Sequence, residues 1–178
     1  MAEIAYRAIR AEDVYEGMLA DYRRHQVVKR RWARADGEWA VVEDDFVDDW
    51  GVAERAEVAE SVRACAGDGG LAFGAFDGER LIGFATVGSR RFGSAGQYVQ
   101  MRQMHVSEEY RGQGVGKRLF RMASDAARAR GDVKLYISTQ SSVETQGFYR
   151  GMGCVDAEEI NQALSEAEPY DCQVEYLL

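Results

Sequence analysis

The sequence lacks any apolar run that approaches the roughly 20 residues needed to cross a bilayer. Its first residues, MAEIAYRAIRAEDVYEG, also lack the apolar centre of a signal peptide. We therefore expect no membrane segment and a cytoplasmic location. The three cysteines, Cys65, Cys154 and Cys172, have neither metal-binding nor redox spacing, so we expect reduced thiols and no metal site. Internal repeats and low-complexity segments are absent as well.

The sequence also lacks an excess of basic residues, because its formal net charge is -8. A nucleic-acid-binding protein needs a dominant basic surface, so we expect no nucleic-acid partner. The charges are unevenly distributed. Basic residues gather around three glycines (Arg102, Arg111, Lys117, Arg118, Arg121), and acidic residues gather elsewhere (Glu43, Asp44, Asp45, Asp48, Asp49). The acidic group is either a solvated surface or a docking face for a cationic substrate.

The length of 178 residues fits one domain, 1–178, with a sizeable core. Apolar spacing and turn residues predict the following elements in chain order: a strand at 4–10, a helix at 13–22, a hairpin around Asp36-Gly37, a helix at 51–66, a hairpin at 71–87, a loop at 88–97, a strand at 98–106, a helix from 115 to near 131, a strand at 133–138, a helix at 142–153 and a strand at 171–178. This order predicts a mixed α/β sheet in one domain.

Two of these predictions depend on residue spacing alone. The helix at 13–22 is inferred from an apolar stripe formed by Val14, Met18, Leu19 and Tyr22. The last strand alternates apolar residues (Cys172, Val174, Tyr176, Leu178) with polar ones (Asp171, Gln173, Glu175). This alternation predicts one buried and one exposed face.

A glycine-rich loop at 111–117 joins a predicted strand to a predicted helix. The first turn of a helix leaves several N–H groups unpaired, and these form an anion site together with the helix dipole. Glycines allow close approach of the backbone to a ligand, and Arg111 and Lys117 add positive charge. The loop fits neither a Walker loop nor a Rossmann fingerprint, because its spacing is G-x-G-x-G and Arg118 follows Lys117. A phosphate site is one interpretation, and a tight turn with incidental charge is the other.

The loop sequence RGQGVG, preceded by MHVSEEY and followed by GFYRGMGC at 147–154, resembles the GCN5-related N-acetyltransferase (GNAT) superfamily. The cofactor signature of that family is Arg/Gln-x-x-Gly-x-Gly/Ala, which Arg111, Gly114 and Gly116 match. The order of elements also matches over most of the chain. Residues 24–50 depart from the family pattern and resemble an inserted hairpin and acidic loop near the substrate site.

The resemblance implies a mostly antiparallel sheet whose central parallel strands, here 103–106 and 134–138, splay apart to admit the pantetheine arm of acetyl-CoA. Backbone amides of 112–117 would hold the pyrophosphate, with Arg111, Lys117 and Arg121 offsetting its charge. Ser142 stands where many members have a cofactor-binding asparagine. The implied cofactor-binding residues are Met104, His105, Val106, Arg111, Gly112, Gln113, Gly114, Val115, Gly116, Lys117, Ser142 and Tyr149.

Acetyl transfer by direct attack requires a neutral amine. With a pKa near 10.4, an alkylamine is neutral in roughly 1 of 2,500 molecules at pH 7, which corresponds to about 4.6 kcal/mol. Tyr149 matches the tyrosine that in the family donates a proton to the leaving thiolate, although packing alone could explain an aromatic residue there. Some members carry a basic glutamate near the position of Gln100, which cannot accept a proton. The base is left open among His105, Glu43, Asp45, Asp48, Asp49 and a water molecule, and Glu144 and Glu175 are poorer candidates.

The favoured function is an N-acetyltransferase that acts on a small, cationic primary amine such as an aminoglycoside-like antibiotic or a polyamine. The alternatives are a protein or peptide N-acetyltransferase and a non-catalytic acyl-CoA-binding module. The sequence leaves open whether the acyl group is acetyl or longer. A homodimer is common in the family, and the resemblance leaves this assembly open for the chain.

Overall fold

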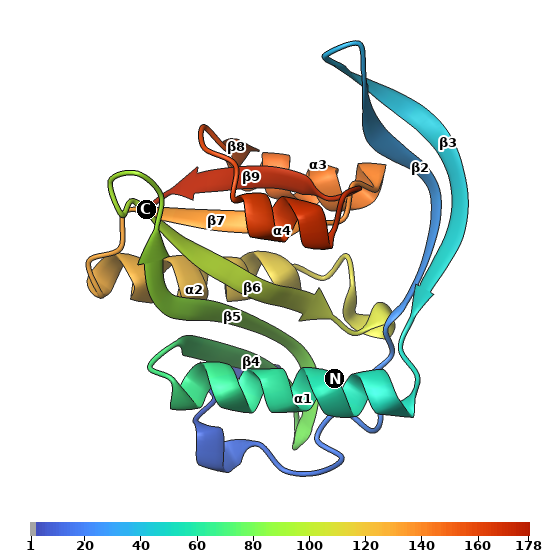
Figure 1. Ribbon diagram of the computed structural model, residues 1–178. Helices are drawn as coiled ribbons and strands as arrows, with labels where there is room; N and C mark the ends of the chain where they lie inside the picture. Colours follow the sequence, from blue (N-terminus) through green and yellow to red (C-terminus); the bar gives the residue numbers. More distant parts are fainter. Residues whose placement is uncertain (1–2) are drawn as a thin grey trace.

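The computed structural model of the protein describes residues 3–178 and contains a seven-stranded sheet of order β1-β4-β5-β6-β7-β9-β8 (Figure 1). The strands are β1 (Ala5–Ala8), β4 (Leu71–Asp77), β5 (Arg80–Phe92), β6 (Tyr98–Val106), β7 (Lys134–Thr139), β8 (Val155–Asp156) and β9 (Cys172–Leu177). All neighbours are antiparallel except β6 and β7. This confirms the expected mixed, mostly antiparallel sheet.

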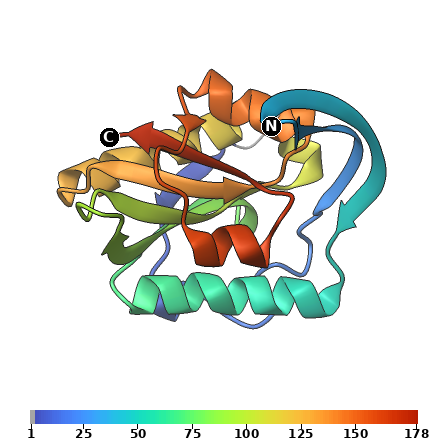
Figure 2. The same cartoon turned by 45° about the horizontal axis from the view of Figure 1, so that its top comes forward.

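Helices cover both faces of this sheet (Figures 1 and 2). The helices α2 (Val115–Ala129) and α3 (Val143–Gly151) lie on one face, and α1 (Val52–Gly67) and α4 (Gln162–Ala167) lie on the other. The main core lies between α2 and the sheet, where Leu119, Phe120 and Ala123 are fully buried. The first three helices were predicted, whereas the short helix α4 and strand β8 were not.

A second core lies under α1, and its amino-terminal part corrects the prediction of a helix at 13–22. The structure has only a 3-10 turn at Ala11–Asp13, followed by further turns. Gly17 adopts a left-handed φ of +82°, which a right-handed helix cannot contain. The apolar stripe is nevertheless buried as a group, namely Val14, Met18, Leu19 and Tyr22.

A separate two-stranded ribbon, formed by β2 (His25–Ala35) and β3 (Glu38–Asp49), confirms the first predicted hairpin. The expected acidic loop is a strand, because the acidic residues lie along β3 opposite basic residues of β2. Asp44 bonds Arg31 at 2.6 Å and Asp45 bonds Lys29 at 2.7 Å. The ribbon runs past the carboxyl end of β7 (Figure 1), where the Trp32 amide donates to the Ser141 carbonyl at 2.8 Å.

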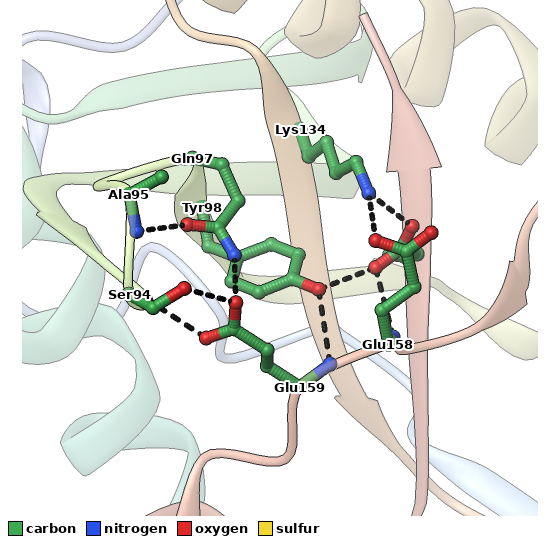
Figure 3. A network of polar contacts seen from close by, with 8 residues as sticks. Ser94, Ala95, Gln97, Tyr98, Lys134, Glu158 and Glu159 are labelled. Carbon is green, nitrogen blue, oxygen red and sulfur yellow. Dashed lines mark hydrogen bonds and ion pairs between the residues drawn. The ribbon is translucent and has the colours of Figure 1, made fainter.

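The last strand, β9, corrects the prediction of one exposed face. Gln173 and Glu175 are only 9% and 5% exposed. The Tyr98 hydroxyl donates to Glu175 at 2.5 Å, and the Lys134 ammonium lies 2.7 Å from the same carboxylate (Figure 3). Partners from other strands therefore make burial of this polar face favourable. The loop expected at 88–97 is also shorter, since β5 continues to Phe92.

The three cysteines are buried free thiols. None of the helices in residues 3–178 is both long and apolar enough to cross a membrane. The same residues contain no group of three His, Cys, Asp or Glu side chains that could hold a metal ion.

Candidate active site

The two parallel strands at the centre of the sheet pair only at their beginnings. The pairs are Tyr98 with Lys134, Val99 with Leu135 and Gln100 with Tyr136. Beyond them β6 continues to pair with β5 as far as Val106, while β7 diverges from it (Figure 1). The splayed strands expected from the family resemblance are therefore present, and their facing edges keep unpaired backbone groups.

The end of β6 presents alternating side chains to the two faces of the sheet. Met104 and Val106 pack into the core under α2. His105 points to the opposite face, where its ring centroid lies 4.7 Å from that of Trp50 and 5.4 Å from that of Phe84. The three residues thus flank the opening with their backbone, as the family resemblance implies.

The glycine loop begins after the 3-10 turn η2 (Glu108–Tyr110) and ends at the amino terminus of α2. Gly112 and Gly114 have φ values of +73° and +83°, which L side chains rarely adopt. The first helical hydrogen bond runs from the Arg118 amide to the Gly114 carbonyl at 3.1 Å. Among the described residues, no amide of 112–117 is the donor of a backbone hydrogen bond outside the helices and strands, and residues 111–114 form a turn. The amides at this helix start form a donor set that fits a pyrophosphate.

Arg111 is the half-buried cation of this loop. Its Nε donates to the Val106 carbonyl at 3.1 Å and its Nη1 donates to the His25 carbonyl at 2.7 Å. The remaining Nη2 is buried without a hydrogen-bond partner in the described chain. Burial, followed by the nearby Arg24 guanidinium, lowers the pKa of Arg111. A cation whose described partners are carbonyls favours an anion beside it.

Of the other basic residues near the loop, Lys117 is exposed. The Arg118 guanidinium lies over the Tyr6 ring, 4.0 Å from its centroid. Gln113 bonds the Glu109 carbonyl at 2.9 Å. A Cβ on Gly116 would lie 3.3 Å from Phe148, so this glycine lets α2 approach α3. Lys117 is thus the basic side chain best placed to add to the charge of the loop.

Tyr149 lies on α3 and is only 5% exposed. It packs against Phe148, with ring centroids 5.2 Å apart. Burial raises the pKa of Tyr149, and a hydrogen bond with the Thr139 side chain at the end of β7 opposes this shift. The hydroxyl is therefore protonated at neutral pH and can donate a proton.

The Ser142 hydroxyl has hydrogen-bond partners within the chain. It is fully buried at the N-cap of α3, where its Oγ accepts from the Thr145 amide at 3.2 Å. The same Oγ lies 2.8 Å from Thr145 Oγ1 and accepts from Gln26 at 3.2 Å. Capping and ribbon contacts thus engage this side chain, and its cofactor role stays a prediction.

His105, one of the bases left open by the sequence, is a weak base in this fold. Burial, and then the charges of Arg24 and Arg111, lower the pKa of His105 to about 3. The imidazole is consequently neutral at pH 7, and its protonated form is strongly disfavoured.

The acidic candidates on β3 separate into distant and near residues. Asp45 and Asp49 are 74% and 61% exposed at the side chain and pair with Lys29 and His25 of β2. Glu43 is exposed opposite Arg30. Asp48 alone reaches the end of β7, where its Oδ2 lies 2.5 Å from Arg24 and accepts from Gln140 at 3.1 Å.

The structure adds one acidic residue that was not among the bases expected from the sequence. Asp171 immediately precedes β9 and accepts a hydrogen bond from the Ser138 hydroxyl at 3.4 Å. Burial, then the charge of Glu168, raises the pKa of Asp171 to about 6. No local motif marks this residue, because its hydrogen-bond partner Ser138 and the nearby Asp48 are distant in the sequence.

Comparison with known proteins agrees with this geometry. The acetyltransferase (GNAT) family matches residues 19–154. The chain therefore belongs to this family, and its class is that of the acetyltransferases. No curated protein sequence matches the chain.

Several solved structures share the fold at low identity. A nourseothricin acetyltransferase has a TM-score of 0.71 and 18% identity, covering 98% of each chain. A putative streptothricin acetyltransferase from Bacillus anthracis, in complex with acetyl coenzyme A, has a TM-score of 0.70 and 17% identity, covering 99% of this chain and 98% of its own. An aminoglycoside 6'-N-acetyltransferase complexed with coenzyme A has a TM-score of 0.54 and 16% identity, covering 70% of this chain and 79% of its own.

Proposed function

We propose that this protein transfers an acetyl group from acetyl-CoA to a primary amine of a small, cationic molecule. The observation that carries the proposal is the row of amides at 112–117, which follows the splayed strand β6 after the turn η2 and leads into α2, the helix whose buried residues pack in one core with Tyr149. Such a row offers a site for a pyrophosphate beside an opening suited to an extended chain. Family membership supports the same reaction class.

The residues of the site fit coenzyme A in three parts. The amides of 112–117, with Lys117, would bind the pyrophosphate, and the free edge of Met104–Val106 would bind the pantetheine arm. Acetyl-CoA supplies the acetyl group as a reactive thioester. Tyr149 would donate a proton to the departing sulfur, because its hydroxyl is protonated at pH 7.

The acceptor side favours a small cation. Glu168 and Asp171 lie close enough for the charge of the first to raise the pKa of the second, and this negative charge attracts an ammonium group, whereas Asp48 is paired with Arg24. The ribbon, bonded to Ser141 and Ser142, covers the carboxyl end of β7. An extended peptide would have to pass this ribbon, whereas a small amine would not. The names of the nourseothricin, streptothricin and aminoglycoside acetyltransferases also point to small molecules. A cytoplasmic location and a homodimer stay predictions.

The first experiment is calorimetric titration with acetyl-CoA, with ATP and NAD as controls. We expect micromolar binding of acetyl-CoA alone. Release of thiol from acetyl-CoA is then measured with streptothricin, aminoglycosides, polyamines and lysine peptides as acceptors. Turnover with the small amines supports the proposal, whereas turnover confined to the peptides, or binding without any turnover, contradicts it.

The variant Tyr149→Phe tests the assigned acid. We expect turnover to fall by about 10²–10⁴-fold, the usual contribution of a general acid, with little change in the dissociation constant of acetyl-CoA. Unchanged turnover would refute the role of Tyr149 and leave the function intact.

A further inference from the structure

The position of Asp171 is set by the register of β7 and β9. Gln173 pairs with Ser138 and Cys172 pairs with Thr139, so Asp171 comes just beyond the carboxyl end of β7. Its side chain lies on the same face as Ser138, to which it is hydrogen-bonded at 3.4 Å. Tyr149 approaches Thr139 from the opposite face. The carboxylate and the phenol therefore lie on opposite faces of the sheet at the end of the same strand.

The Ser138 hydroxyl is held in place by a chain of hydrogen bonds. Gln173 Nε2 donates to Ser138 Oγ at 2.8 Å, and Gln173 Oε1 accepts from the Tyr136 hydroxyl at 2.8 Å. The backbone amide of Asn161 donates to the same Tyr136 oxygen at 2.9 Å. Because Ser138 Oγ already accepts from Gln173, its own proton is free to point at Asp171.

Asp171 differs from the other partly or fully buried acids near the opening in having no cation of its own. Asp48 lies 2.5 Å from Arg24, and Glu175 lies 2.7 Å from Lys134. Within residues 3–178, no basic group is among the neighbours that shift the pKa of Asp171. A carboxylate that is already paired gains little from taking a proton, whereas an unpaired one in a partly buried site is a stronger base.

The charged and polar groups around Asp171 come from the segment before β9, from the β2–β3 ribbon and from β7. Burial raises its pKa most, Glu168 and Asp48 add to the rise, and the Ser138 hydroxyl opposes it. Arg31 of β2 pairs with Asp44, and its guanidinium lies over the Tyr170 ring at 5.1 Å. The resulting pKa of about 6 leaves Asp171 about 90% ionised at pH 7.

We propose that Asp171 accepts the proton that the acceptor ammonium must lose before it attacks. This inference rests on the proposed function. In the transfer, a C–N bond forms at the acetyl carbon and the C–S bond breaks. The ammonium group loses two protons in total. One passes to Asp171 and from there to water. The other leaves the nitrogen after the attack and replaces the proton that Tyr149 supplies to the thiolate. Asp171 thereby supplies the base that Gln100 cannot.

The test is the pH dependence of kcat/KM in Asp171→Asn. We expect native kcat/KM to rise with pH through about 6 and then to level off. The variant should lose about 10²–10⁴-fold at pH 7. Its kcat/KM should instead rise about tenfold per pH unit towards the pKa of the amine, near 10.4, because it depends on amine deprotonated in water. Acetyl-CoA affinity by calorimetry should not change.

Controls separate a base from a structural residue. Asp171→Glu should restore most of the activity and the native profile. Asp125→Asn, the same change at a side chain that is 71% exposed on α2, should leave both unchanged. A ¹³C NMR titration of the free native protein should show a carboxyl group with a pKa of about 6 that disappears in Asp171→Asn.

The outcomes are distinct. A lower rate in Asp171→Asn with the native pH profile, or an unchanged rate, overturns the role of Asp171 and leaves the proposed function standing. No turnover by the native protein with any amine overturns both.

Discussion

Lys134 bonds two carboxylates that differ in their exposure to water. One substitution at each carboxylate measures how burial changes the contribution of the ion pair to the free energy of unfolding. Its Nζ lies 2.7 Å from Glu175 and 2.9 Å from Glu158 (Figure 3). The two glutamate side chains are 6% and 74% exposed, respectively. Glu175→Gln and Glu158→Gln therefore remove the same charge from the same lysine in two different environments.

The structure gives the expected size of each effect. The Glu175 carboxylate also accepts from the Tyr98 hydroxyl at 2.5 Å and from the Glu158 amide at 3.1 Å. Glutamine keeps one acceptor oxygen, so the substitution loses one or two charge-assisted bonds of about 1.5–3 kcal/mol each. We expect Glu175→Gln to lose about 3 kcal/mol of unfolding free energy, or about 6–12 °C in Tm for a chain of this length. Glu158→Gln should lose less than about 1 kcal/mol.

Thermal and urea unfolding at pH 7, followed by circular dichroism, measure both variants. Burial opposes ionisation of Glu175, but hydrogen bonds from Lys134 and Tyr98 outweigh it and lower the pKa of this carboxyl. The stability it contributes is therefore present above its unfolded pKa, about 4.3, and is lost as the pH falls through the lower folded value. The difference between Glu175→Gln and the native protein should shrink in acid. Equal losses in the two variants at pH 7 would refute the reasoning from burial.

Three other predictions concern the loop and its surroundings. Burial, and then the Arg24 and Arg111 charges, lower the pKa of His105 to about 3. Between about pH 6.5 and 3 the imidazole is therefore protonated only in the unfolded chain, and the native protein loses stability as the pH falls. His105→Gln should reduce this loss. The native slope should reach about 1.4 kcal/mol per pH unit in urea unfolding, and equal slopes in both proteins would contradict this. Gly114→Ala should cost about 1–2 kcal/mol because φ is +83°. Gly147→Ala, at a helical position with nothing within 4 Å of the new Cβ, should gain about 0.5–1 kcal/mol, and thermal unfolding distinguishes the two signs. Arg111→Lys should weaken acetyl-CoA binding about tenfold in calorimetry, because one ammonium cannot bond both carbonyls that the guanidinium bonds. Unchanged affinity would argue against a role of Arg111 in cofactor binding.

The parts of the fold that carry local signals could be predicted from the sequence. The strand at 98–106, the glycine loop and the helix that follows are marked by alternation, by glycine and by helical spacing, and the structure has all three. Spacing alone was insufficient at 13–22. The stripe of Val14, Met18, Leu19 and Tyr22 is buried as expected, yet Gly17 takes a conformation that ends any helix there. Burial and helical structure are separate properties, and an apolar stripe at helical spacing predicts burial more securely than it predicts a helix.

The parts of the site that depend on distant partners could not be predicted. Gln173 and Glu175 alternate with apolar residues, which is typical of an exposed face. They are buried because Tyr98, Lys134 and Tyr136 on other strands supply hydrogen bonds. Asp171 had no visible role for the same reason, since Ser138 and Asp48 are distant in the sequence and meet it only in the folded chain.

The divergence of β6 and β7 amounts to two edge strands placed in the middle of a sheet. At the rim of a sheet, unpaired edges invite pairing with other chains and aggregation. Here β5 and β9 flank the two strands, and the β2–β3 ribbon crosses their carboxyl ends. The fold therefore keeps unpaired hydrogen-bonding groups in the middle of the sheet instead of at its rim.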